Sequence, residues 1–372
     1  MNKKIRAAGA LILTLVWGIL ILFAWFSPAK SFSDAERRDL FQFPDVNQKN
    51  ILSGKFMTDF EKYALDQFPL RDTFRSLKAM FHSYALLQQD NNDIYLADGY
   101  LAKQDHPLNE SEVTAATNRI TQIYNKFLKD SGSRVFYAIV PDNGYYLAGS
   151  SGHLAMDYQK LFSHMHDTLS FATPIDLTGS LSLDNYYYTD THWRQETLIP
   201  TAGTICTALD MPVPKAEDYT VTDATDAFYG VYHGQAALPL KPETLYLMES
   251  DRLRELQVSI HNGMKYAPVS YTGVYDLEKL ESKEPYDVFL SGPQSLLRID
   301  NPNATTDREL IIFRDSFGSS VAPLLISEYR SVTLVDTRYL NSQLLGRFIE
   351  FNGQDVLFLY SSLVLNTGSI IK

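Results

Sequence analysis

The sequence predicts an α/β protein in which helices cover both faces of a central parallel sheet, preceded by an N-terminal transmembrane helix. Short apolar runs alternate with segments of helical length over residues 134–210 and 310–360, an order typical of a parallel sheet between two helical layers. A run of about 20 uncharged residues, 7–26, is long enough to cross a bilayer. With 372 residues and 45% hydrophobic content, the chain can bury a large core.

The N-terminal run predicts a single-pass anchor over residues 1–29. Lys3, Lys4 and Arg6 precede it, and such a positive flank stays in the cytoplasm, which places the chain after Pro28 outside. A cleaved signal peptide is the alternative, but residues 24–27, AWFS, form a poor small-residue cleavage site. We therefore expect a cell-membrane protein with an extracytoplasmic domain, and both interpretations place that domain outside the cytoplasm.

A polar linker is expected over residues 30–52, followed by one domain over residues 53–372. Its first helices, at 53–67 and after Pro69, carry apolar stripes that we expect to pack in the core (Phe56, Phe60, Tyr63 and Ala64; Phe74, Leu77, Phe81 and Tyr84). Residues 94–101 predict a hairpin because Asp98-Gly99 separates two alternating runs. Helices are then expected at 111–130, 153–169 and 196–209, with strands at 135–140 and 174–177.

The middle of the domain, about 212–285, reads as an irregular, β-rich insertion with a short strand at 244–247. Regular alternation then resumes with strands at 310–313, 331–335 and 356–360 and helices at 316–328 and 341–350. The runs 135–140 and 310–313 are continuously apolar, as expected of strands buried on both faces.

Composition excludes several classes of protein. The net charge of −11 and the pI near 5.2 argue against nucleic acid as a partner, because phosphate binding needs a basic surface. Cys206 is the single cysteine, so no internal disulfide and no thiolate metal site can form from this chain. It lies in the apolar run 205–209, which predicts a buried structural thiol.

Ser316 is the candidate nucleophile. It directly follows the apolar strand 310–313 and opens a helix, which places its hydroxyl at the carboxyl edge of the sheet, where open α/β folds bind ligands. The helix N-terminus offers N–H groups to a developing oxyanion. The alternative is that Ser316 is only a helix cap beside Asp315.

Asp190 and His192 are the candidate acid and base. One residue separates them, and in an extended chain positions i and i+2 project to the same side. Asp190 can then fix the imidazole tautomer while the other ring nitrogen takes a proton from Ser316. A metal site is a second interpretation of Asp-x-His, and it predicts chelator-sensitive activity that survives loss of Ser316. No other histidine pair has a matching spacing except His164 and His166, which point apart on a helix.

Residues 188–193, YTDTHW, together with 314–317, RDSF, resemble the SGNH-hydrolase-like proteins of polysaccharide O-acetylation. The DHHW family is most similar, with the alginate O-acetyltransferases AlgJ and AlgX as more distant relatives. The resemblance extends over most of the exported region, through further blocks at residues 41–44, 53–56, 66–72, 286–290 and 335–339.

The resemblance implies a flavodoxin-like, SGNH-hydrolase-like three-layer sandwich with Ser316 as nucleophile, His192 as general base and Asp190 as its orienting acid. It implies an O-acetyltransferase or acetylesterase that acts on a cell-surface polysaccharide and needs no metal or dissolved cofactor. A membrane-bound O-acyltransferase is the implied partner, since acetyl donors must be relayed from the cytoplasm. Trp193 either shapes the base loop or is a core aromatic, and Arg338 either reaches the site or is structural.

Two departures from the family pattern bear on activity. Thr191 stands where the family name has its first histidine, between acid and base. Residues 290–294, LSGPQ, replace a Gly-Gly-Asn-like block whose Asn is a candidate oxyanion donor. Pro293 has no N–H, which leaves Gly292 and Gln294 as the candidates in this loop. The competing hypothesis is therefore a catalytically inactive carbohydrate-binding or assembly protein on the same fold.

Overall fold

The computed structural model describes residues 3–33, 35–261, 263–326 and 328–372. The chain divides into two compact units. The smaller unit holds the chain up to Asn91 together with His233–Pro239, and the larger holds Asn92–Tyr232 and Leu240–Lys372. The division at residues 91 and 92 lies later in the chain than the domain start at residue 53 suggested by the sequence.

A mixed, mostly parallel sheet of eight strands forms the centre of the larger unit, in the order β10-β9-β11-β13-β12-β14-β5-β6. Its parallel part has five strands: β13 (Ser331–Val335), β12 (Glu309–Arg314), β14 (Asp355–Ser361), β5 (Arg134–Val140) and β6 (Thr173–Ile175). The other three are antiparallel: β11 (Leu296–Asp300), β9 (Gln257–His261) and β10 (Tyr266–Pro268). Residues 257–268 thus extend the sheet, although the sequence placed them in an irregular excursion.

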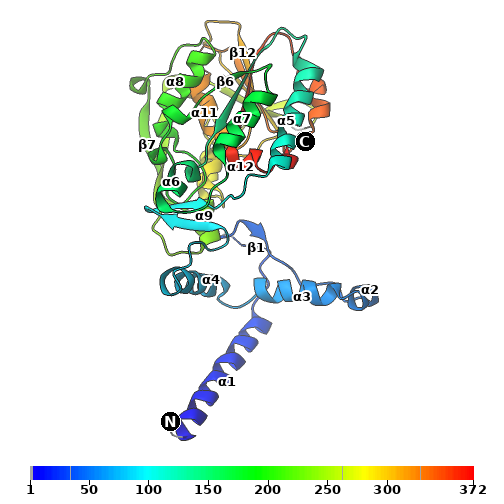
Figure 1. Ribbon diagram of the computed structural model, residues 1–372, viewed down its shortest axis with the longest axis vertical. Coiled ribbons are helices and arrows are strands. Elements are labelled where there is room, and N and C mark those ends of the chain that lie inside the picture. The colour runs from blue at the N-terminus through cyan, green and yellow to red at the C-terminus, as the bar shows by residue number, and fades with distance from the viewer. Residues whose placement is uncertain (1–2, 34, 262, 327) are drawn as a thin grey trace. The chain divides into compact units, whose positions relative to one another are not determined.

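Helices cover both faces of this sheet, so the predicted three-layer α/β architecture is confirmed (Figure 1). Alternate residues of β5 enter two different hydrophobic clusters, Phe136 and Ala138 on one face and Val135 and Tyr137 on the other. The first cluster includes buried residues of α8 (Ile199–Ala208) and α11 (Phe317–Leu325). The second includes those of α5 (Glu110–Ile123) and α7 (Tyr158–Thr168).

Smaller elements complete the larger unit. The predicted hairpin is confirmed as β3 (Ile94–Ala97) and β4 (Tyr100–Lys103), with positive φ at Asp98 and Gly99. A separate two-stranded sheet pairs β7 (Thr220–Phe228) with β8 (Glu243–Glu249). Short helices are α6 (Asn143–Ser151), α10 (Asp251–Glu255) and α12 (Ser362–Leu365), and α9 (Val231–Ala236) begins in the larger unit and ends in the smaller one.

Two predicted helices differ from those observed. The helix expected at 341–350 is only a 3₁₀ segment, Ser342–Arg347, and the one expected at 111–130 changes at Tyr124–Leu128 into a π-helical turn.

The smaller unit contains α1 (Lys3–Phe26), the short strands β1 (Phe32–Ser33) and β2 (Arg38–Asp39), α2 (Gln48–Leu52), α3 (Lys55–Asp66) and α4 (Arg71–Met80), which continues as a π-helical turn over Phe81–Ala85. The expected core packing of its apolar stripes is wrong. Phe60 is 38% exposed, Leu77 52% and Tyr84 62%. This unit is too small to cover both faces of its helices.

Candidate active site

Ser316 lies between the end of β12 and the first residue of α11, at the carboxyl edge of the parallel strands. It occupies the N-cap position, but its side chain makes no capping hydrogen bond. Asp315 takes that role, because its Oδ1 accepts from the Phe317 N–H at 3.1 Å and its Oδ2 from the Ser361 N–H at 2.8 Å. The helix-cap interpretation of Ser316 is therefore wrong, and its hydroxyl is available for chemistry.

His192 connects Ser316 to Asp190. Its Nε2 lies 2.7 Å from the Ser316 Oγ, and its Nδ1 lies 2.5 Å from the Asp190 Oδ1. Asp190 is completely buried, His192 is 8% exposed and Ser316 is only partly buried. The Asp190 carboxylate is thus shielded from water, while the Ser316 hydroxyl remains accessible. These contacts have the geometry of an acid–base–nucleophile relay.

A tight turn, and not an extended strand, brings Asp190 and His192 together. The Tyr187 N–H donates to the His192 carbonyl at 3.1 Å, which closes the loop. The Asp190 Oδ1 also accepts the His192 N–H at 2.9 Å, an Asx-type turn that holds the carboxylate beside the ring two residues later. The pairing was expected, but its expected conformational reason was wrong.

A second segment, which the sequence did not single out, holds Asp190 from the other side. The Val231 N–H donates to the Asp190 Oδ2 at 2.7 Å. Gly230 permits this approach, because a Cβ there would lie 2.3 Å from the Asp190 Cβ. Below the loop, Glu243 accepts hydrogen bonds from the N–H groups of Tyr188 and Thr189 at 2.8 and 2.7 Å. Burial raises the pKa of Glu243 despite these bonds.

Two aromatic rings fix the orientation of the imidazole. Tyr286 stacks on His192 with ring centroids 3.9 Å apart and an angle of 11° between the planes. Its hydroxyl donates to the Ser320 Oγ at 2.8 Å, which anchors it to α11. Phe317 contacts the ring at 5.1 Å. Tyr286 lies in a sequence block that carried the family resemblance, but nothing local to it indicated this role.

The loop at residues 290–294 lies next to the strand that carries Ser316. Leu290, Ser291 and Gly292 have φ values of 56°, 59° and 71°, a strained run for the first two residues of the kind that functional sites tend to hold. The buried Arg314, two residues before Ser316 in the chain, donates to the Gly292 carbonyl at 3.2 Å and so attaches this loop to the end of β12. At Gly292 itself a Cβ would lie 2.1 Å from the Asp287 carboxylate.

The predicted donor Gln294 is engaged within its own loop. Its amide donates to the Ser291 carbonyl at 2.9 Å, and no hydrogen bond joins it to Ser316 in the described part of the chain. The backbone N–H of Ser316, at the N-terminus of α11, has no hydrogen-bond acceptor among the described residues. It is thus the donor best placed to stabilise an oxyanion.

Trp193 and Arg338 both make close contacts within the protein. Trp193 is completely buried, and its Nε1 donates to the Ser320 Oγ of α11 at 2.8 Å. Arg338 forms a bidentate pair with Asp336 at 2.9 and 2.7 Å. Burial alone would lower its pKa, but the hydrogen bonds and charge of Asp336 raise it.

Among the residues that the structure describes, no three or more His, Cys, Asp or Glu side chains lie together in a way that could hold a metal ion. Both ring nitrogens of His192 are already occupied by Asp190 and Ser316.

Comparison with known proteins confirms the resemblance. The family described as DHHW protein matches residues 159–335, a range that includes Asp190, His192 and Ser316. No curated protein sequence matches this chain.

Solved structures share the fold. A DHHW family protein from Eubacterium siraeum aligns with a TM-score of 0.60 at 18% identity, covering 76% of this chain and 95% of its own. Bacillus cereus PatB1, solved with a sulfonyl adduct, aligns with a TM-score of 0.60 at 19% identity, covering 73% and 95%. The O-acetyltransferase domain of Pseudomonas putida AlgJ is more distant, with a TM-score of 0.44 at 13% identity, covering 73% and 92%.

Proposed function

We propose that this chain is an extracytoplasmic, serine-dependent O-acetyltransferase or acetylesterase that acts on a cell-surface polysaccharide through an acyl-serine. The observation that carries the proposal is the relay from Asp190 through His192 to the partly exposed Ser316. The acetyl group and the polysaccharide rest on the resemblance to the DHHW family.

In the first half-reaction, the His192 Nε2 removes the proton from the Ser316 hydroxyl as its oxygen attacks the acetyl carbonyl. The C–O bond to the donor breaks, and His192 returns the proton to the leaving oxygen. In the second half-reaction, His192 deprotonates a sugar hydroxyl or water as its oxygen attacks the acyl-serine carbonyl. The C–O bond to the Ser316 oxygen breaks, and His192 returns the proton to that oxygen, which restores Ser316. Asp190, with an oxygen on Nδ1, holds the tautomer that leaves Nε2 free to accept the proton.

The tetrahedral intermediate needs donors for its oxyanion. The Ser316 N–H supplies one. In the strained turn at residues 290–292, the N–H groups of Leu290 and Gly292 already donate to the carbonyls of Val274 and Phe289, which leaves the Ser291 N–H as the candidate for a second. Loss of one such donor typically costs about 2.7–4 kcal/mol of transition-state stabilisation. The replacement of an Asn-like donor in this loop therefore predicts a slower enzyme, and not an inactive one, if the turn supplies the second N–H.

The proposed location is supported by the N-terminal span, and the proposed partner rests on the family resemblance. Lys4–Ala24 is long and apolar enough to span a membrane, and its basic flank orients the following domain outward. An acetyl donor outside the cytoplasm must come through the membrane, so we propose a membrane-bound O-acyltransferase as the partner that relays it.

The test uses the full chain in detergent with a chromogenic acetyl ester. The wild type is expected to release the chromophore, and Ser316→Ala is expected to abolish release, while Ser150→Ala, at an exposed serine of α6, changes nothing. A sulfonyl fluoride should add one adduct to the wild type by intact mass, as PatB1 accepts a sulfonyl group, and none to Ser316→Ala. Turnover by Ser316→Ala would refute the acyl-serine.

The second candidate is a catalytically inactive carbohydrate-binding or assembly protein. The observation that favours it is the loop at 290–294, where Pro293 has no N–H and the Gln294 amide is bound to Ser291. This candidate predicts neither turnover nor adduct from the wild type, together with saturable binding of the polysaccharide.

A further inference from the structure

The helices that follow the predicted span expose continuous apolar faces. On α4 and its π-helical extension, Leu70, Phe74, Leu77 and Phe81 recur at helical spacing and are 61%, 44%, 52% and 57% exposed. On α3, Met57 and Phe60 are exposed beside the half-buried Phe56 and Tyr63. Large contiguous apolar surfaces of this kind mark interaction sites.

We propose that these apolar faces of α3 and α4 lie in the outer headgroup layer of the membrane that α1 crosses, so that the smaller unit sits on the lipid surface. This inference rests on the proposed membrane anchor and adds a second membrane contact to it. Amphipathic helices bind membranes in this manner, with the apolar face roughly 5–10 Å inside the boundary between headgroups and acyl chains.

The chain itself ties α3 to the end of the span. The Lys30 N–H donates to the Gln67 side-chain oxygen at 2.9 Å, and the Gln67 amide returns a hydrogen bond to the Lys30 carbonyl at 2.8 Å. Gln67 is the C-terminal cap of α3. Lys30 follows Phe26, the last residue of α1, by four residues, which span at most roughly 14 Å when extended. The junction of α3 and α4 is therefore held close to the membrane surface.

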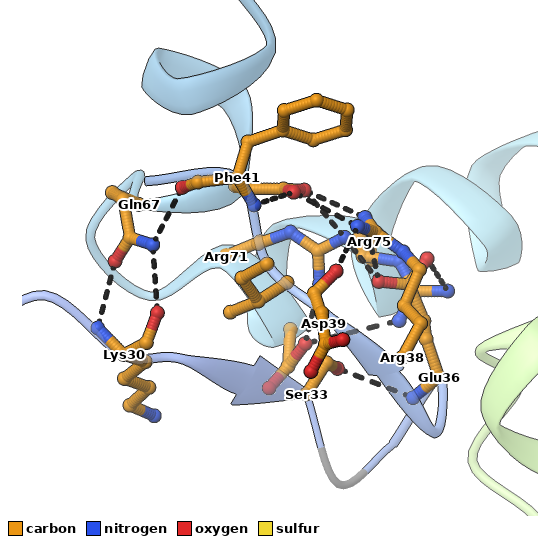
Figure 2. A network of polar contacts seen from close by, with 12 residues as sticks. Lys30, Ser33, Glu36, Arg38, Asp39, Phe41, Gln67, Arg71 and Arg75 are labelled. Carbon is orange, nitrogen blue, oxygen red and sulfur yellow. Dashed lines mark hydrogen bonds and ion pairs between the residues drawn. The ribbon is translucent and has the colours of Figure 1, made fainter. Parts of the chain in front are cut away.

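A polar network joins the β1–β2 segment to these two helices (Figure 2). Arg38 forms a bidentate pair with Asp66 of α3 at 2.8 and 2.6 Å. Glu36 pairs with Arg71 and, at 3.3 Å, with Arg75, both on α4. These contacts bind the β1–β2 segment to both helices through residues outside their apolar faces. Exposed polar residues, among them Thr58 and Asp72, cover other parts of the helix surfaces.

Lipid fits these faces better than a protein partner for two reasons. The C-terminal end of α3 is hydrogen-bonded to Lys30, which follows the 21-residue apolar span Lys4–Ala24 closely in the chain, so a bilayer is already within reach. The apolar faces are also rich in Phe and Leu, which interfacial amphipathic helices carry on their apolar face. The exposed Lys78 lies beside the face of α4 and can reach lipid phosphates. A second copy of this chain or another membrane protein remains as an outcome of the test.

The test places single spin labels on the full chain in vesicles of neutral and anionic phospholipid. Cys206, the only cysteine, is buried, and Cys206→Ala gives a background without it. Labels replace Phe60 and Leu77 on the apolar faces, Thr58 on the polar side of α3 as the matched control, and Leu15 within α1 as the control for the anchor. Collision rates are measured with oxygen, which partitions into lipid, and with a water-soluble nickel chelate.

Interfacial burial predicts that the ratio of oxygen to nickel collisions at Phe60 and Leu77 is roughly tenfold above that at Thr58 and below that at Leu15. Equal ratios at Phe60, Leu77 and Thr58, with a high ratio at Leu15, would overturn the membrane contact and leave the anchor standing. An aqueous ratio at Leu15 would overturn the anchor itself. Protection of Phe60 and Leu77 from both reagents, or dipolar broadening between copies, would identify a protein interface and overturn the proposal.

Discussion

Replacement of Asp190 by Asn tests the relay most directly. The carboxylate is completely buried and accepts hydrogen bonds from the His192 N–H at 2.9 Å, the His192 Nδ1 at 2.5 Å and the Val231 N–H at 2.7 Å. The amide of Asn has the same shape but only one acceptor oxygen, so it cannot accept hydrogen bonds from both His192 and Val231.

Both orientations of the introduced amide are unfavourable. If its NH₂ faces His192, the ring must accept at Nδ1 and carry its proton on Nε2, the wrong tautomer for a general base. If its NH₂ faces Val231, one buried N–H loses its acceptor, at a cost of about 1–3 kcal/mol. A base held in the wrong tautomer typically lowers kcat by about 10,000-fold, equivalent to about 5.5 kcal/mol at about 1.36 kcal/mol per tenfold.

We therefore expect Asp190→Asn to lower kcat/KM for a chromogenic acetyl ester by about 1,000- to 10,000-fold, with little change in KM. The variant should still fold, with its free energy of unfolding reduced by about 1–3 kcal/mol in chemical denaturation. Activity within about threefold of the wild type in a folded variant would refute the assignment of Asp190 as the orienting acid.

Three further predictions concern the support of the site and the fold. Gly230→Ala should reduce the free energy of unfolding by about 1–3 kcal/mol, because its Cβ meets the Asp190 backbone and Cβ. The melting temperature and kcat/KM should therefore both fall, and an unchanged melting curve would contradict this close approach. Tyr286→Phe keeps the stack on His192 and should cost about 1 kcal/mol of stability through its lost bond to Ser320, whereas Tyr286→Ala should also lower kcat/KM by roughly tenfold; equal activities would show that the stack does not position the base. Burial raises the pKa of Asp355, but hydrogen bonds from Arg134, Tyr329 and Arg308 outweigh it and bring the pKa below the usual value of 3.8. The ionised carboxylate therefore stabilises the fold fully above pH 3.8, and this stabilisation is lost as the pH falls through the lower pKa of the folded state. The wild type should accordingly melt higher than Asp355→Asn at pH 7, with the gap closing below about pH 4; a gap independent of pH would refute the ionic role of Asp355.

Local sequence predicted the parallel core well because its strands carry their signal in a few consecutive residues. The apolar runs at 135–140, 310–313, 331–335 and 356–360 each coincide with a strand of the central sheet. The antiparallel strands β9 and β11 were missed. Their residues mix charged and apolar side chains, as in the LLRID of β11, because these strands lie toward the margin, where burial on both faces is not required.

The apolar stripes on α3 and α4 show where local sequence does not predict burial. Their helical period was correct, and helices formed at both positions. Period alone gives the direction of an apolar face but not what covers it. Both helices fall in a small unit that holds none of the central sheet, which leaves Phe60 and Leu77 exposed.

By itself, the sequence determined the strand-and-helix alternation, the apolar span and the pairing of Asp190 with His192, since each depends on neighbouring residues. Only the tertiary structure decided that Ser316 meets His192 across 124 residues of chain and that the Asp315 side chain, not that of Ser316, caps α11. It also decided that Gly230, Val231 and Tyr286 hold Asp190 and His192 in place. These contacts arise where β12, the loop at 187–192 and two distant segments converge. No local pattern encodes such a convergence, because it depends on how the whole sheet and its helices pack.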